Sequence, residues 1–256
     1  VRIALNLKGL EFEQVAIHLR RGGGEPLKPA NKAINPQALV PALEDEGQVF
    51  SQSLAIIEYL EERYPKPPLL PSDAAERAVV RSMALLIACE VHPIQNLRVL
   101  NHLKSDHKQS DDDTIRWARH WINLGFSALE QMINSVTGRE DFCFGKTPTM
   151  ADICLVSHAT GCNFFKYDLA PYPTVRRIVY ECMKNDAFAR AHPLKQRGAP
   201  QGHQVVQRVW HKRLLEPGDG LRRRAIIDRD RPDGYLLQLF AEPLFDRPTM
   251  FYEVIE

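Results

Sequence analysis

The sequence of 256 residues has no excess of charge of either sign and no long hydrophobic run. Its 33 Lys and Arg residues face 32 Asp and Glu residues, so the net charge of +1 predicts neither a nucleic-acid partner nor an anionic-membrane partner. The longest apolar stretches, such as residues 83–89, are much shorter than the roughly 20 residues of a membrane span. We therefore expect no nucleic acid and no membrane among its partners.

Cysteine is also scarce, and the spacing of the few cysteines bears on whether disulfides or a zinc ion could hold the fold together. The five cysteines are an odd number, and no two of them form a Cys-x-x-Cys pair. This spacing disfavours both a disulfide framework and a zinc site, and it is typical of a protein in a reducing cytoplasm. What is present is an ordinary globular composition, with 44% hydrophobic and 25% charged residues. The length predicts one or two domains.

Residues 1–64 predict a small α/β unit. Apolar positions from Val1 to Leu7, followed by Gly9, indicate the end of an amphipathic helix. Alternating residues over Phe12–Leu19 indicate a strand. Two short strands with a turn between them complete the pattern: Ala42–Glu44, Glu46-Gly47 and Val49–Phe50.

A strongly periodic helix follows these strands. We expect Ser53 to cap it and expect it to run to Tyr64. As a residue at a helix N-terminus, Ser53 would offer a hydroxyl and free backbone N–H groups to a carboxylate, which the helix dipole also favours. The buried face of this helix is predicted to carry Leu54, Ile57, Tyr59 and Leu60.

The dipeptide Val40-Pro41 precedes a predicted strand and favours a cis peptide bond. Such a bond would leave the N–H and C=O of Val40 free to pair with an extended peptide. Val40 and Ser53 together would suit a small acidic peptide lying along a strand edge. On local sequence alone, the alternative is that Pro41 ends a loop and Ser53 only caps a helix.

The chain continues with a linker and a helical unit. Residues 65–72 contain four prolines and predict a stiff linker. Residues 73–196 show helical periodicity with almost no strand signal, which predicts an all-α domain. Thr149 and Asp152 resemble a capping box. The expected helices are Ala74–Leu103 with a bend at His92-Pro93, Asp112–Val136, Met150–Cys162 and Val175–Lys184.

The last segment, residues 197–256, contains many Gly and Pro breakers. Its three predicted strands are Ala225–Ile227, Tyr235–Phe240 and Met250–Ile255. About sixty residues with so few short strands are a poor candidate for a self-sufficient core. We therefore expect this tail to be loosely attached and dispensable for ligand binding.

An α/β unit, a Pro-rich linker and an all-α unit in this order resemble the glutathione transferases. Four segments resemble their zeta class, the maleylacetoacetate isomerases: Val1–Gly9, Gln52–Glu61, Gln95–Leu100 and Thr149–Asp152. The resemblance runs from Val1 to about Gln196. It implies a two-domain α+α/β glutathione transferase fold: a thioredoxin-like domain over 1–64, the linker 65–72 and the all-α domain 73–196.

The resemblance also implies an activity. The implied reaction is the glutathione-dependent cis–trans isomerisation of maleylacetoacetate to fumarylacetoacetate, in tyrosine and phenylalanine catabolism. Glutathione is the implied cofactor, because its thiolate adds to the double bond, the bond rotates and the thiol leaves. The implied partners are a small dicarboxylate substrate and a second copy of the chain in a homodimer.

By motif, the resemblance implies a set of glutathione-binding residues. Val40 would pair with the cysteinyl backbone of glutathione, while Gln52 and Ser53 would hold its γ-glutamyl group. Asp152 is expected to be a structural cap rather than a ligand. Four residues would approach the same site from the helical domain: His92, Asn96, Leu97 and Arg98.

The sequence departs from the zeta class at its start. In that class, a first strand and a Ser-Ser-Cys-Ser-Trp-Arg motif precede the position of Val1, and the sequence contains neither. The serine and cysteine there activate the glutathione thiol, so no catalytic residue is assigned. Without them the thiol would keep a pKa of about 8.5, and we expect weak binding and poor turnover from a chain that we interpret as a fragment.

The tail has a resemblance of its own, to the C-terminal end of 4-hydroxyphenylpyruvate dioxygenase, carried by Asp233–Phe240 and Asp246–Ile255. In that family the position of Glu253 is the carboxylate of a two-His, one-carboxylate iron site, and those of Gln238 and Phe240 line the substrate pocket. The tail contains only His203 and His211, in contexts unlike the family's ligand motifs. We therefore expect no metal site, with Glu253 as a remnant ligand position.

Three alternatives stay open at this point. The chain could be a catalytically impaired glutathione-binding or dimerisation module. It could catalyse another zeta-class reaction, such as glutathione-dependent conversion of small α-haloacids. It could instead be a 4-hydroxyphenylpyruvate dioxygenase fragment, which the missing histidines disfavour. A natural or artificial joining of two neighbouring reading frames would explain both resemblances.

Overall fold

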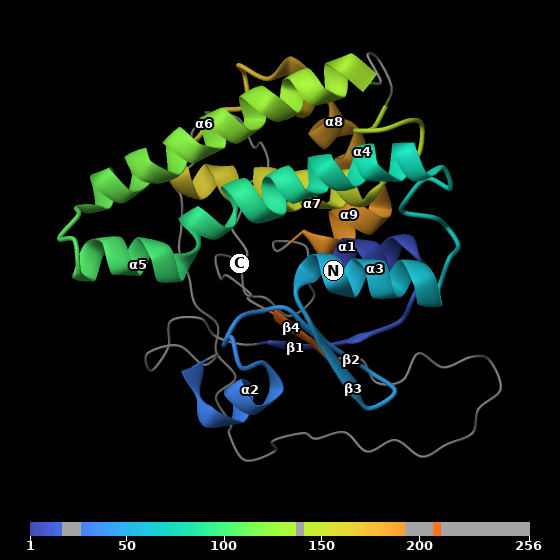
Figure 1. Cartoon of the computed structure of the whole chain (residues 1–256), viewed down its shortest axis with the longest axis horizontal. Coiled ribbons are helices and arrows are strands. Elements are labelled where there is room, and N and C mark those ends of the chain that lie inside the picture. The colour runs from blue at the N-terminus through green and yellow to red at the C-terminus, as the bar shows by residue number, and fades with distance from the viewer. Residues whose placement is uncertain (17–26, 137–140, 193–206, 211–256) are drawn as a thin grey trace.

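An α/β unit and a bundle of helices follow one another along the chain (Figure 1). The computed structural model describes residues 1–16, 27–136, 141–192 and 207–210. The α/β unit contains α1 (Arg2–Leu7), β1 (Glu13–Ala16), α2 (Pro29–Ile34), β2 (Ala42–Asp45), β3 (Gln48–Ser51), α3 (Ser53–Arg63) and β4 (Gln207–Trp210). The helical unit contains α4 (Ala74–Leu85), the π-helix η3 (Leu86–Val91), the 3-10 helix η4 (Pro93–Gln95), α5 (Leu97–Ser105), α6 (Asp111–Val136), α7 (Met150–Cys162), the 3-10 helix η5 (Asn163–Phe165), α8 (Pro173–Lys184) and α9 (Asp186–Ala191).

The hairpin β2–β3 forms as the sequence predicts. The two strands pair antiparallel, with Ala42 opposite Ser51 and Leu43 opposite Phe50. Glu46 and Gly47 form the turn with φ angles of 50° and 78°. Positive φ at both central residues gives a turn whose twist matches that of the paired strands. The inner strand buries Leu43, while the outer strand is largely exposed.

The strand β4 lies far along the chain but pairs with β1. The pairing is antiparallel, with Glu13 opposite Trp210 and Ala16 opposite Gln207, and β4 also lies beside β2 (Figure 1). The expectation of a loosely attached tail is therefore wrong for residues 207–210, which pair within the sheet. The other strands predicted in the tail lie outside the described residues.

Several helix predictions are confirmed, and two helices were not foreseen. The helix α1 ends before Gly9, whose φ of 66° is the left-handed conformation that glycine adopts freely. The predicted bend at His92-Pro93 is the site of η3 and η4. The helices α2 and α9 are only six residues long each, too short for apolar periodicity to reveal them.

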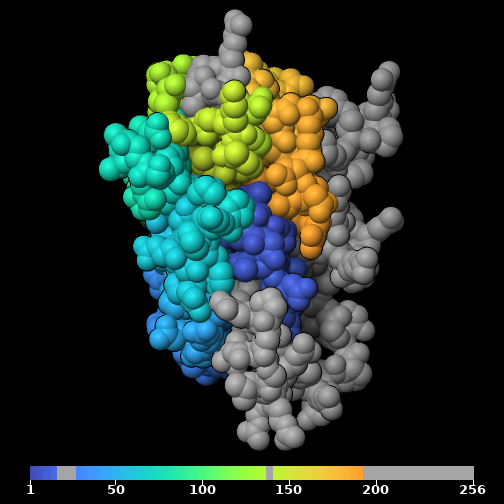
Figure 2. All heavy atoms as spheres, turned by 90° about the vertical axis from the view of Figure 1, so that its right-hand side faces the viewer, coloured from blue at the N-terminus to red at the C-terminus, as the bar shows by residue number. Residues whose placement is uncertain are grey.

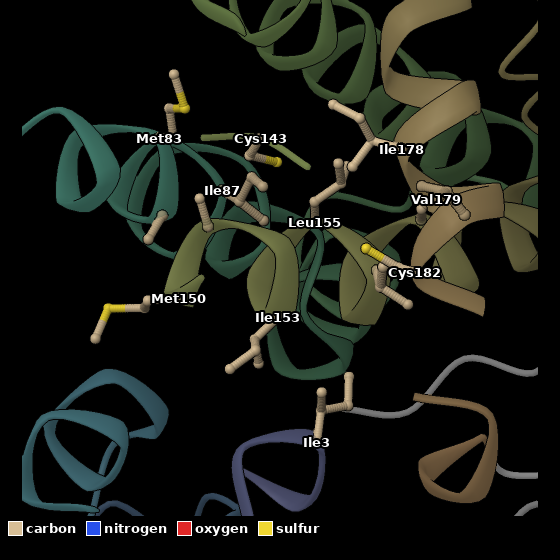
Figure 3. Packing of buried hydrophobic residues seen from close by; sticks show 14 of the residues in the cluster. Ile3, Met83, Ile87, Cys143, Met150, Ile153, Leu155, Ile178, Val179 and Cys182 are labelled. Atoms are coloured by element: carbon tan, nitrogen blue, oxygen red, sulfur yellow. The ribbon is translucent and has the colours of Figure 1, made fainter. Parts of the chain in front are cut away.

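The helix α7 forms the centre of the core. Eleven of its 13 residues are buried, as expected for a helix that is apolar on all sides. Figure 3 shows Leu155 of α7 near Ile178 of α8, and Ile3 of α1 below Ile153 of α7. The core of the helical unit therefore extends into the α/β unit, and α1 also packs against α9, where Asn6 Nδ2 donates to the carbonyl of Ala187 at 2.9 Å.

A buried ion pair joins α1, α3 and the linker. Lys8 Nζ lies 2.8 Å from Glu61 Oε2, and the Lys8 side chain is fully buried. Nζ also donates to the carbonyls of Tyr64 and Pro67, at 2.5 Å and 3.1 Å. Glu61 in turn accepts the backbone N–H groups of Leu69 and Leu70. Every charge in this cluster thus has a partner, which a buried ion pair needs.

One stretch of the described chain, Ala74–Ser105, is long and apolar enough to cross a membrane by length and composition alone. The stretch is interrupted at η3 and η4, and its side chains Val80, Met83 and Ile87 belong to the core. A core helix of a soluble protein passes the same test.

We expect Lys8→Met to lower the free energy of unfolding by about 3–5 kcal/mol, because it leaves the Glu61 carboxylate buried without its cation. Urea unfolding followed by circular dichroism measures the change. Adding Glu61→Gln to Lys8→Met should cost less than the sum of the two single changes, because the two side chains interact directly. Additive effects would show that the pair is not coupled.

We also expect ending the chain after residue 196 to destabilise the α/β unit by about 2 kcal/mol, because β1 loses its four paired residues. Ending the chain after Trp210 is the matched control, since it keeps β4. Thermal unfolding of both shortened chains and the full chain measures the effect. Equal stability of the two shortened chains would contradict the β1–β4 pairing.

Candidate functional site

The loop before β2 presents Val40 with an open backbone. The Val40–Pro41 peptide bond is cis, as predicted. The side chain of Asn35 organises the loop, since Nδ2 donates to the Leu39 carbonyl at 2.8 Å and Oδ1 accepts from the Gln37 N–H at 3.1 Å. Within the described residues, no hydrogen bond uses the backbone N–H or C=O of Val40. Both groups are thus free to pair with an extended ligand.

The N-terminus of α3 differs from the prediction in one respect. Ser53 is the first residue of the helix, and the N-cap position belongs to Gln52. The expectation that Ser53 caps the helix is therefore wrong, and no side chain caps α3 at all. The serine hydroxyl is left beside the first-turn N–H groups, which have no partner within their own helix.

Gln52 connects this helix end to the Val40 loop. Its φ of 69° lies in the left-handed region, which costs a residue other than glycine roughly 1–3 kcal/mol. Its Nε2 donates to Gln37 Oε1 at 2.6 Å, across to the loop that leads to Val40. The structure thus brings together Val40, Gln52 and Ser53, the three residues that the sequence predicts for one site.

Val40, Gln52 and Ser53, together with the first turn of α3, form a corner that fits a peptide with a free carboxylate. The first turn of α3 offers uncapped N–H groups and the positive end of a helix dipole, where an anion binds favourably. The Val40 backbone offers one donor and one acceptor for a peptide backbone. Glutathione carries both features, because its γ-glutamyl end has a carboxylate and its cysteinyl residue has a backbone.

The second group of predicted residues flanks the break between α4 and α5. His92 follows the π-helix η3, and Asn96 is the N-cap of α5, where its Oδ1 accepts from the Arg98 N–H at 3.1 Å. Leu97 begins α5 and is half-buried, while Arg98 is exposed. In Figure 1 this break and the N-terminal end of α3 lie toward the same side of the molecule.

Sequence reasoning missed a buried polar pair behind this break. Gln95 and His158 are 3% and 7% exposed, and their Nε2 atoms lie 3.2 Å apart. The His158 ring meets the rings of His92 and Phe126 edge-on. A histidine in the middle of an apolar helix was the available signal, because such a residue needs a polar partner when buried.

Burial sets the protonation state of both histidines. Burial lowers the pKa of His158 to about 3, with a smaller contribution from the charge of His92. Burial likewise lowers the pKa of His92. His158 is therefore a neutral ring at physiological pH, able to accept a hydrogen bond at one nitrogen.

Asp152 is a structural cap, as the sequence predicts. It completes a capping box with Thr149 at the start of α7 and also accepts the Cys143 N–H at 2.7 Å. Burial raises the pKa of Asp152, and hydrogen bonds from Cys143 and Thr149 oppose the rise. All its oxygens are thus used by the fold.

The cysteines are free thiols of two kinds. Cys89, on η3, is exposed. Burial raises the pKa of Cys154 to about 12 and also raises the pKa of three other thiols: Cys143, Cys162 and Cys182. These four thiols are therefore protonated and unreactive at neutral pH.

No group of three His, Cys, Asp or Glu side chains that could hold a metal ion occurs among the described residues. The segments that carry the resemblance to an iron dioxygenase lie outside the described residues, and so do the tail residues discussed for an iron site: His203, His211, Gln238, Phe240 and Glu253. That relation stays a prediction.

Comparisons with known proteins agree with a glutathione transferase fold. The family model for the glutathione S-transferase N-terminal domain matches residues 1–68. The chain is 46% identical to a maleylpyruvate isomerase of a Ralstonia species over 196 residues, which is 77% of this chain and 92% of the relative. It is 44% identical to the maleylacetoacetate isomerase of Pseudomonas aeruginosa and 42% identical to that of Mus musculus, covering 92% and 89% of these relatives and 78% of this chain in each case.

Solved structures agree with these relatives. The holo structure of a maleylpyruvate isomerase, a bacterial glutathione S-transferase in the zeta class, superposes with a TM-score of 0.75 at 45% identity and covers 78% of this chain and 93% of that one. A maleylacetoacetate isomerase from Methylobacterium extorquens with bound malonate and glutathione gives a TM-score of 0.73 at 43% identity, over 78% of this chain and 92% of that one. The chain belongs to the zeta-class glutathione transferases, the family of the maleylacetoacetate and maleylpyruvate isomerases.

The neutral state of His158 predicts a pH dependence. In the unfolded chain His158 takes up a proton below about pH 6.5, whereas the folded chain resists protonation down to about pH 3. The unfolded state therefore binds more protons in this window, and stability falls as the pH decreases through it, by up to about 1.4 kcal/mol per pH unit.

We expect His158→Phe to remove part of this slope. Urea unfolding between about pH 7 and about pH 5 measures it. Thr160→Val, which removes a non-titrating buried side chain on the same helix α7, is the control and should leave the slope unchanged. The prediction is wrong if His158→Phe keeps the slope of the parent chain.

Proposed function

We propose that this chain binds glutathione at Val40, Gln52 and Ser53 and catalyses the glutathione-dependent cis–trans isomerisation of maleylacetoacetate to fumarylacetoacetate. The observation that supports the proposal best is the uncapped N-terminus of α3, with the Ser53 hydroxyl beside it and the free backbone of Val40 across from it. A helix that begins without a cap leaves its first N–H groups available for an anion.

Each residue of this corner has a binding task. The N–H and C=O of Val40 pair with the cysteinyl backbone of the tripeptide and hold it extended. The Ser53 hydroxyl and the first N–H groups of α3 bind the γ-glutamyl carboxylate. Gln52, held by Gln37, fixes the backbone at the helix start so that these donors converge.

The helical domain supplies the other wall of the proposed site. His92 is a neutral ring in this environment, because burial lowers its pKa. Arg98 is exposed, and its guanidinium group suits the binding of a substrate carboxylate. The cap formed by Asn96 directs the Arg98 backbone at the start of α5.

When bound, glutathione supplies a thiol nucleophile for reversible addition to the cis double bond of the substrate. The chain's own residues hold the tripeptide, set its direction and place the substrate carboxylates. The named relatives include both maleylacetoacetate and maleylpyruvate isomerases. Initial rates with the two substrates, each with glutathione, would test which one this chain prefers.

We include a homodimer in the cytoplasm in the proposal. Large hydrophobic side chains are exposed on α4 and α6, among them Leu85 at 45% and Leu124 at 49%, and a second copy of the chain would remove such surface from water. The free cysteines support a reducing compartment. Light scattering coupled to gel filtration would test the dimer.

We expect Ser53→Ala to weaken glutathione binding about fivefold, because it removes one hydrogen bond to the carboxylate, worth about 1 kcal/mol. Titration calorimetry on the full chain measures the dissociation constant. Ser82→Ala is the control, since this exposed hydroxyl on α4 bonds only to the Val79 carbonyl of its own helix. Equal affinity of Ser53→Ala and the parent would reject the role of Ser53.

A further inference from the structure

The break between η3 and α5 leaves a carbonyl group that the helix itself does not satisfy. In a continuous helix the Gln95 N–H would bond to the Val91 carbonyl, but here it bonds to the His92 carbonyl at 3.3 Å. The Gln95 side chain takes over, since its Nε2 donates to the Val91 carbonyl at 3.1 Å. The Gln95 side chain thus satisfies the Val91 carbonyl that the break leaves without a backbone partner.

The same amide group ties the break to α7. An amide nitrogen has two hydrogens and no acceptor capacity, so the second hydrogen of Gln95 Nε2 points to Nε2 of His158 at 3.2 Å. The His158 nitrogen must then accept, which agrees with its neutral state. The reverse orientation would place Gln95 Oε1 against the Val91 carbonyl oxygen, where two acceptors repel. Oε1 is instead buried without a partner in the described residues.

The helix α6 holds the break from the other side. Trp117 Nε1 donates to the Ile94 carbonyl at 2.7 Å. Gly125 lets α6 approach so closely that a Cβ atom there would lie 2.1 Å from a methyl group of Val91. The segment 91–96 is therefore fixed by contacts from α6 and α7 as well as by its own side chains.

The helical-domain residues that the proposed function needs lie within this fixed segment or directly after it. His92 lies within it, with its ring edge-on to the His158 ring at 5.9 Å between centroids. Asn96, Leu97 and Arg98 follow directly after Gln95. A shift of Gln95 would thus change the direction in which α5 begins.

We propose that Gln95 and His158 are positioning residues, which set the placement of His92 and of the segment Asn96–Arg98 through the buried hydrogen bond between their side chains. This proposal rests on the proposed function for the ligand-binding roles of those residues. Its structural part, a buried hydrogen bond that fixes the start of α5, stands independently of any ligand.

The test compares four variants of the full chain. Gln95→Met keeps the length of the side chain and removes both donors, while His158→Phe keeps a ring and removes the acceptor. His158→Gln restores an acceptor oxygen. Thr160→Val is the matched control, because it removes a buried hydrogen bond of the same helix, to the Val156 carbonyl, two residues further along.

We expect Gln95→Met and His158→Phe to raise the dissociation constant for glutathione about tenfold. His158→Gln should stay within about threefold of the parent, and Thr160→Val should bind like the parent although it is less stable. Hydrogen exchange without ligand should become faster at residues 97–100 in Gln95→Met and His158→Phe, and not in Thr160→Val.

The two readouts separate the possible failures. If the parent chain itself binds no glutathione, the proposed function is wrong. If exchange at residues 97–100 stays unchanged in Gln95→Met and His158→Phe, or rises equally in Thr160→Val, the positioning role is overturned whatever the binding result. Weak binding in Thr160→Val equal to that in Gln95→Met would also overturn it, because the effect would then be one of stability alone.

Discussion

The contact between Lys8 and Glu61 is the constraint on which the arrangement of the two units depends. The lysine directly follows α1 and the glutamate lies on α3. Their other hydrogen bonds reach Tyr64 at the end of α3 and the linker at residues 67, 69 and 70. Because a buried charge tolerates little displacement, the last turn of α3 and the start of the helical unit are held in one geometry. The first turn of α3, with its binding groups, is thus placed by contacts at its opposite end.

Much of the fold follows from local patterns in the sequence. The capping box of Thr149 and Asp152, the turn at Gly47 and the break at Pro93 each depend on a few neighbouring residues, so the sequence alone predicts them. The pairing of β4 with β1 could not be predicted in this way. It joins residues almost two hundred positions apart, and four residues carry too weak a pattern to reveal a partner strand.

The residues of the candidate site also fall into two groups, those that a local sequence signal predicts and those that it does not. Val40 and Ser53 were predictable because each stands beside a local signal, a proline or a helix start. The cap at Ser53 was misplaced by one residue, since serine is common both at the N-cap and just after it, and only the backbone angles of Gln52 decide between them. The pair of Gln95 and His158 connects helices that are far apart in sequence, so its existence depends on packing that no short segment records.

The difference in exposure among the five cysteines makes Cys89 a natural attachment site for a spectroscopic label. Four of its cysteines, three of them buried and Cys154 half-buried, are acids too weak to ionise, whereas Cys89 is exposed on the π-helix, three residues before His92. A thiol-directed fluorophore or spin label would therefore attach at one defined place without any engineered substitution. Its signal would report on η3, just before the break that precedes α5, so changes of mobility there could be followed in solution as they occur.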